Sequence, residues 1–189
     1  MDCIKASYIS TLALFLSITF FSGTVSASRR LAGDSNITSL ISSTCSHTLY
    51  VDVCMASLQS HASSQTADLH GLASISINVT VSQAKENINF ITTMKDHPSS
   101  PQDEYVSSCL DDCLIQYGDA IDDLEQSDEA LREGEFGTMN IMVAGAMENA
   151  NSCEKGFGEK EGVQSPLKDL NEFFMKLCSN SMAISNLLA

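Results

Sequence analysis

The sequence predicts an all-α protein, an up-and-down four-helix bundle with a short helical part before it. Apolar residues recur at steps of three and four along most of the chain, which is the period of an amphipathic helix. Few breaks interrupt these patterns, since the chain has three prolines and long stretches without glycine. One short segment alternates like a strand, but no second such segment offers it a partner, as a sheet would need.

The N-terminal segment, residues 1–27, is predicted to be a secretory signal peptide. It has Lys5, an apolar run from Ile9 to Phe21 and the small residues Val25-Ser26-Ala27 at a cleavage site. The apolar run is too short for a membrane span. Residues 28–189 then form one domain of ordinary size, in which no later stretch is long enough to cross a bilayer.

The net charge of −14 limits the kinds of molecule that are expected to bind this protein. Nucleic acids and anionic membranes bind through Lys and Arg, so neither is expected as a partner. The acidic surface favours a basic partner, or serves solubility alone.

The first helical part is expected over about residues 36–60, with a turn at His47-Thr48. The next segment, Leu69 to Ile91, has two interpretations, because Ile75, Ile77, Val79 and Val81 alternate with polar residues as in a strand. The helical stripe extends over the whole segment, however, and the alternation over less than half of it. We therefore expect a helix.

Three later segments have apolar stripes at helical spacing. The first comprises Val106, Cys109, Leu110, Cys113, Leu114, Tyr117, Ala120, Ile121 and Leu124, with Asp111, Asp112, Asp119, Asp122 and Asp123 pointing away from it. The second comprises Met139, Met142, Val143, Ala146, Ala150 and Cys153. The third comprises Leu167, Leu170, Phe173, Phe174, Leu177, Ile184 and Leu188. Pro98 and Pro101 precede the first stripe, and Ser165-Pro166 is expected to open the last helix as N-cap and first helical residue.

The cysteines are expected to form disulfides. Seven cysteines less Cys3, which leaves with the signal peptide, give six in an oxidising compartment. Six cysteines allow fifteen connectivities. Cys109 and Cys113 share one helix face but are too far apart for an unstrained bridge to each other. Two sequons, at Asn36 and Asn78, are candidate glycosylation sites if they lie on the surface.

Catalysis is not expected. The four histidines, at positions 47, 61, 70 and 97, are scattered, and none has cysteine or carboxylate at a metal-ligand spacing. The sequence contains no nucleophile elbow, Walker loop or zincin motif. Adjacent aspartates on a helix splay apart and usually form a solvated face. We therefore expect no catalytic residues, no cofactor and no metal.

Three motifs occur in order along the chain. The first is Cys45-Ser-His-Thr48-Leu-Tyr50-Val-Asp-Val-Cys54. The second is Leu110-Asp-Asp-Cys113-Leu-Ile-Gln-Tyr117-Gly-Asp-Ala120-Ile-Asp-Asp-Leu124. The third is Met142-Val-Ala-Gly-Ala-Met147, followed by Cys153-Glu-Lys-Gly-Phe157. Together they resemble the motifs of the plant invertase and pectin methylesterase inhibitor family, including its pollen-type members, over nearly all of the mature chain.

The resemblance implies a four-helix bundle with an N-terminal helical hairpin and two disulfides. Carried over residue by residue, these pair Cys45 with Cys54 and Cys113 with Cys153. Cys109 and Cys178 remain, and a second additional cysteine departs from the family pattern. They either pair with each other or stay buried as reduced thiols.

The resemblance also implies a function: a secreted inhibitor that docks on a carbohydrate-active enzyme of the cell wall and blocks its substrate cleft. Invertase inhibitors of the family commonly have Pro-Lys-Phe where this chain has Gly134-Glu135-Phe136, which favours pectin methylesterase as the target. The segments Thr66 to Gly71 and Cys153 to Pro166 resemble pollen-type invertase inhibitors, so acid invertase, in the wall or the vacuole, is the alternative. A non-inhibitory structural or signalling bundle and a small-ligand carrier are the further alternatives.

Four carboxylates are predicted to contribute charge to the docking surface: Asp119, Asp122, Asp123 and Glu129. An acidic surface is steered towards a cleft that receives polygalacturonate, most strongly at low salt.

Overall fold

The computed structural model describes residues 40–96 and 104–189. The predicted signal peptide and its boundary at residue 27, the sequon at Asn36, and both Pro98 and Pro101 lie outside these residues. Within the described residues the regular structure is helical and contains no strand, so the all-α prediction is confirmed.

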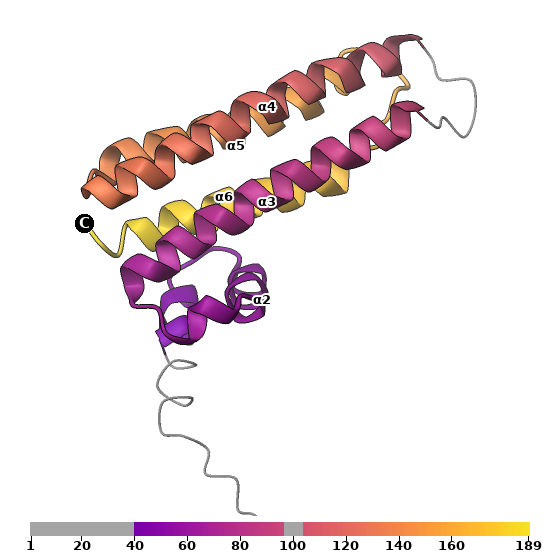
Figure 1. Cartoon of the computed structure of the whole chain (residues 1–189). Coiled ribbons are helices and arrows are strands. Elements are labelled where there is room, and N and C mark those ends of the chain that lie inside the picture. The colour runs from indigo at the N-terminus through magenta and orange to yellow at the C-terminus, as the bar shows by residue number, and fades with distance from the viewer. Residues whose placement is uncertain (1–39, 97–103) are drawn as a thin grey trace, which may run out of the picture. The chain divides into compact units, whose positions relative to one another are not determined.

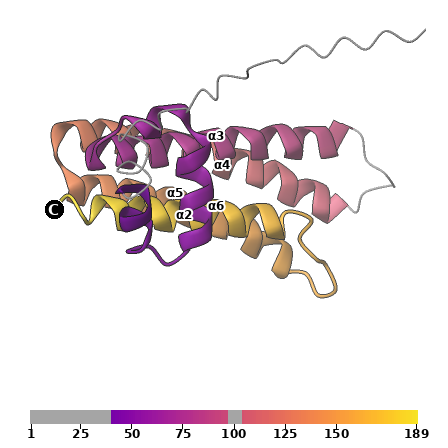
Figure 2. The same ribbon diagram turned by 90° about the horizontal axis from the view of Figure 1, so that it is seen from below.

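Four long helices form the bundle (Figures 1 and 2). They are α3 (Leu69–Asp96), α4 (Glu104–Glu133), α5 (Phe136–Gly158) and α6 (Lys168–Ser185). Each helix packs against its neighbours in the sequence, and α6 closes the ring by packing against α3. Helices α3 and α5 therefore occupy diagonal corners, as do α4 and α6, which confirms the up-and-down four-helix bundle.

A small helical hairpin precedes the bundle. Residues 40–45 are helical, a turn follows, and α2 (Val51–Ser60) and the 3₁₀ helix η1 (Ala62–Gln65) complete it. Helix α2 packs against α3 and α6. The buried Asn180 of α6 donates a hydrogen bond to the backbone oxygen of Tyr50 at 3.0 Å, which also joins this hairpin to the bundle.

Helix α3 resolves the ambiguous segment in favour of a helix, as predicted. Two of the polar residues of the alternating pattern, Ser76 and Thr80, are not solvent-facing, because they are buried together with Ile77. The Thr80 hydroxyl donates to the Ser76 backbone oxygen at 2.9 Å, and the Ser76 hydroxyl pairs with that of Ser181 at 2.7 Å. These internal partners let short polar side chains occupy the buried face of a helix.

The predicted stripes form most of the core, but two details of the last helix were wrong. Phe173 is 39% exposed, whereas its neighbour Phe174 is fully buried. Helix α6 begins at Lys168, and its N-cap is Leu167 rather than Ser165. The Ser165 hydroxyl instead accepts a hydrogen bond from the Leu167 N–H and donates one to the carboxylate of Glu154. Ser165 therefore satisfies a backbone donor just before the helix.

A tight turn joins α4 to α5. Gly134 has φ = +77°, its N–H donates to the Leu131 oxygen, and the Glu135 N–H donates to the Ala130 oxygen. This pair of bonds is the Schellman arrangement, in which a left-handed residue ends the helix. Glycine adopts that conformation without steric cost, and Glu135 is already the N-cap of α5.

The structure contains the two disulfides that the family resemblance implies. Cys45–Cys54 ties the first helical residues to α2, with a Cα–Cα distance of 5.6 Å. Cys113–Cys153 joins α4 to α5, with a Cα–Cα distance of 4.8 Å. Cys109 and Cys178 are buried and unpaired. Of the two alternatives for these residues, the structure has the reduced thiols.

Candidate functional site

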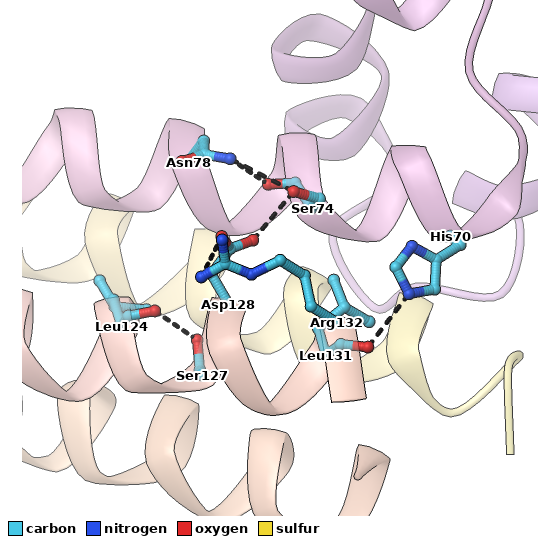
Figure 3. Close-up of polar contacts among 8 residues, drawn as sticks. All are labelled: His70, Ser74, Asn78, Leu124, Ser127, Asp128, Leu131 and Arg132. Carbon is cyan, nitrogen blue, oxygen red and sulfur yellow. Dashed lines mark hydrogen bonds and ion pairs between the residues drawn. The ribbon is translucent and has the colours of Figure 1, made fainter. Parts of the chain in front are cut away.

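The described residues do not include a cluster of metal-binding side chains. No group of three His, Cys, Asp or Glu side chains among them could hold a metal ion. His47 and His61 are exposed, and His70 is half-buried. The Nε2 of His70 donates to the Leu131 backbone oxygen at 3.0 Å (Figure 3), so this imidazole joins α3 to the end of α4.

The same helix pair is joined by a chain of polar side chains (Figure 3). The Ser74 hydroxyl donates to Asp128 at 2.9 Å, and Arg132 lies 3.7 Å from the other carboxylate oxygen of Asp128. The Asp128 carboxylate therefore interacts with Ser74 and Arg132 of the protein itself. It does not belong to the free acidic surface of α4.

Three of the four predicted docking carboxylates lie exposed on α4. Asp119, Asp122 and Glu129 are all exposed. Asp122 follows Asp119 by three positions and precedes Glu129 by seven, which are spacings that place helical residues on one face. The structure therefore brings these three carboxylates onto a single acidic face.

Asp123 differs from the other three, because it is half-buried against α5. The Asn149 amide donates to its Oδ2 at 3.2 Å, and a Cβ at Gly145 would lie 2.8 Å from the same oxygen. Burial raises the pKa of Asp123, and the nearby charges of Asp119 and Asp122 raise it further. The expectation that Asp123 points away from the bundle was wrong, because Gly145 leaves room for its carboxylate at the α4–α5 contact.

Two exposed isoleucines on the same helix pair were missed by the sequence analysis. Ile115 of α4 is 62% exposed and Ile141 of α5 is 69% exposed. Ile115 lies two residues after Cys113, and Ile141 lies four residues before Gly145. Since α4 and α5 are antiparallel, the acidic residues 119–123 lie between these isoleucines along the helix pair. In the sequence, both isoleucines stand outside the apolar stripes of their helices, and this was the signal from which their exposure could have been predicted.

A groove of about 360 Å³ runs between the first half of α4 and the second half of α5. Its lining includes Asp112, Ile115, Gln116, Ser152 and Lys155. It is a surface groove with polar walls. The bundle interior is filled instead by large side chains, among them Tyr117, Phe157 and Phe174, each almost fully buried. This packing disfavours a carrier of small ligands within the bundle.

Residues 39–184 match the family model described as "Plant invertase/pectin methylesterase inhibitor". The chain belongs to the plant invertase/pectin methylesterase inhibitor family. It is therefore a member of a family of enzyme inhibitors and not of enzymes. The resemblance seen in the three motifs is confirmed.

Relatives in this family bear names from both target classes. A "Pectinesterase inhibitor" from Actinidia deliciosa is 30% identical over 149 residues, which are 79% of this chain and 79% of the relative. A "Cell wall / vacuolar inhibitor of fructosidase 2" from Arabidopsis thaliana is 31% identical over 159 residues, 84% of this chain and 86% of the relative.

The fold is also that of the family. The crystal structure of a mutant form of a pectin methylesterase inhibitor from Arabidopsis superposes with a TM-score of 0.65 and 24% sequence identity. The match covers 79% of this chain and 97% of that one. Among the described residues, no helix has both the length and the apolar composition required to cross a membrane.

Proposed function

We propose that the protein inhibits a pectin methylesterase by docking on the enzyme and covering its substrate cleft. The observation that carries this proposal is the acidic face of α4, formed by Asp119, Asp122 and Glu129 on a firmly held helix pair. The Cys113–Cys153 bridge and the two-residue turn at Gly134 hold α4 and α5 together. A rigid surface binds tightly because little conformational entropy is lost on docking.

Charge favours pectin methylesterase over invertase as the target. Pectin is a polyanion, so the cleft that receives it must tolerate or attract negative charge. Sucrose is neutral, so the cleft of an invertase does not have to accept negative charge. The acidic face of α4 therefore complements a pectin-binding cleft, and complementary charge increases the rate of association.

The α4–α5 turn supports the same choice. The family's invertase inhibitors commonly have Pro-Lys-Phe at Gly134-Glu135-Phe136. Proline fixes φ near −65°, whereas residue 134 here has φ = +77°. The exposed turn of this protein therefore has a different backbone conformation from a turn that begins with proline.

Acid invertase is the second candidate target. The relative named as an inhibitor of fructosidase is as similar to this chain as the relative named as a pectinesterase inhibitor. We place the protein outside the cell, in the wall, after removal of the predicted signal peptide. The vacuole is the alternative location that accompanies the invertase alternative.

Competition with substrate tests inhibition by occupancy. The oxidised protein without residues 1–27 is titrated into a plant pectin methylesterase at increasing concentrations of pectin. Occupancy of the cleft predicts that the apparent inhibition constant rises in proportion to pectin. Inhibition that does not depend on the pectin concentration would show binding elsewhere on the enzyme and contradict the proposed mechanism.

Charge variants test the acidic face. The variant D119N/D122N/E129Q removes three charges from α4, and E86Q/E161Q/E172Q removes three exposed charges elsewhere as a matched control. At about 0.01 M salt, where the screening length is about 30 Å, only the α4 variant is expected to associate markedly more slowly. Equal slowing by both variants would assign the effect to net charge alone, and no slowing would discard the charge assignment.

A further inference from the structure

We propose that the sequon Asn78-Val79-Thr80 carries an N-linked glycan, and that its first sugar lies in a groove beside Asn78. This inference is independent of the target enzyme. It uses three features of α3: the exposure of Asn78, the burial of Thr80, and a polar groove next to the Asn78 side chain.

The burial of Thr80 determines when the glycan is attached. Thr80 is fully buried, and its hydroxyl donates to the Ser76 oxygen inside α3. A glycosyl transferase must reach both the asparagine amide and the hydroxyl two residues later, and in the folded helix it reaches only the first. Attachment therefore precedes the folding of α3, while the chain enters the secretory pathway.

The folded helix accommodates the product. In the transfer, Asn78 Nδ2 bonds to the C1 atom of a lipid-pyrophosphate-linked oligosaccharide, the bond from C1 to the pyrophosphate oxygen breaks, and Nδ2 loses one proton. Asn78 is exposed, and its Nδ2 donates to the Ser74 backbone oxygen at 2.9 Å and contacts the Ser74 hydroxyl at 3.4 Å (Figure 3). One N–H remains after glycosylation and can keep the shorter bond.

The groove beside Asn78 has the chemistry of a sugar site. Its volume is about 270 Å³, and it is lined by His61, Asn78, Val79, Ser82, Gln83 and Glu86. Sites for drug-sized ligands measure about 300–1,000 Å³, so this groove suits one sugar ring rather than a whole oligosaccharide. The hydroxyl and acetamide groups of N-acetylglucosamine match the polar rim, and Val79 offers an apolar contact to the ring.

Occupancy is tested on the full-length chain secreted from a eukaryotic host, in an N36Q background that leaves one sequon. After enzymatic deglycosylation in ¹⁸O-water, peptide mapping should find Asn78 converted to ¹⁸O-labelled aspartate. N78Q and T80V should each lose one glycan, and T80S, which keeps the hydroxyl, should retain it. An unmodified Asn78 in the secreted, folded protein would overturn the proposal.

The groove is tested by the rate at which peptide N-glycosidase F releases the glycan from the native protein. H61A/E86A removes two exposed groove side chains, and H47A/E161A removes the same residue types elsewhere. Release several-fold faster from H61A/E86A alone would confirm that the sugar lies in the groove. Equal release rates from both variants and the parent would show that it does not.

Discussion

The Tyr117 hydroxyl donates a 2.7 Å hydrogen bond to the side-chain oxygen of Asn171 inside the bundle. The amide of Asn87 donates to the same hydroxyl at 2.9 Å, and the Asn171 amide donates to Glu154 at 2.7 Å. One polar chain thus joins α3, α4, α6 and α5. Satisfied networks of this kind favour one arrangement of helices over others, because a shifted helix would leave buried polar groups unpaired.

The first prediction is that Y117F destabilises the protein by about 1–3 kcal/mol, because the Asn87 Nδ2 donor and the Asn171 Oδ1 acceptor both lose their bond to the buried hydroxyl. The edge-to-face contact between the rings of residue 117 and Phe174 is retained, so the loss of stability measures the contribution of the hydroxyl alone. Burial raises the pKa of Tyr117 far above its usual value, so the hydroxyl keeps its proton and the effect holds from acidic to alkaline pH. Urea unfolding measures it.

Y105F is the matched control for Y117F. The Tyr105 hydroxyl donates to the Gly156 oxygen, but this bond is only partly buried, so water can replace it. A loss of stability in Y117F no larger than that in Y105F would contradict the importance of the internal network.

The second prediction concerns the two remaining thiols. The unreduced protein should show two free thiols after denaturation and slow labelling of both when folded. Cys178 should react last, because burial raises its pKa and only the thiolate is nucleophilic. Cys109, which lines the groove between α4 and α5, should react before it. Alkylation followed by peptide mapping measures both rates. A denatured protein without free thiols would reveal a third disulfide instead.

The third prediction is that the same substitution has opposite effects at two glycines of the α4 region. Gly118 lies within α4, and a Cβ there meets no atom within 4 Å, so G118A should stabilise by about 0.5–1 kcal/mol. G134A should destabilise by about 1–2 kcal/mol, because residue 134 is left-handed. Urea unfolding compares them, and changes of the same sign would refute the description of the turn.

The fourth prediction concerns pH and Asp123. Its folded pKa is raised above the ordinary value of 3.8, so the native state holds this proton more tightly than the unfolded state. Its contribution to stability is therefore present at low pH and is lost as pH rises from about 3.8 through the folded pKa. D123N, which remains neutral, should become progressively more stable than the parent over that window.

Thermal unfolding between acidic and neutral pH measures this difference. E129Q makes the same change of charge at an exposed position of α4 and should show no comparable gain. Parallel curves for D123N and the parent would contradict the raised pKa of the Asp123 carboxylate.

The sequence was sufficient to predict the four long helices and most of the residues on their packed faces. Leu110 and Leu124, which recur at helical spacing, are fully buried in α4, as predicted. The disulfide partners required the family motifs, because spacing alone left every long-range pairing open. The helical interpretation of α3 rested on the length of its stripe, and the burial of Ser76 and Thr80 explains why the alternation was misleading.

Contacts between helices could not be predicted from the sequence. They depend on which side chains of a neighbouring helix lie at the same height along the bundle. Asn87 and Asn171 are polar in sequence but buried in the structure, since each finds a partner across the bundle. Asp123 packs inward because Gly145 leaves space for it. The start of α6 was misplaced because Ser165 accepts the hydrogen bond of the Leu167 N–H just before the helix and is not its N-cap.

The most direct test of the account is a titration of the oxidised protein, without residues 1–27, into a pectin methylesterase and an acid invertase across acidic to neutral pH. The account predicts that pectin methylesterase activity falls to zero at one inhibitor per enzyme while invertase remains active. Inhibition of invertase alone, or of neither enzyme, would contradict it.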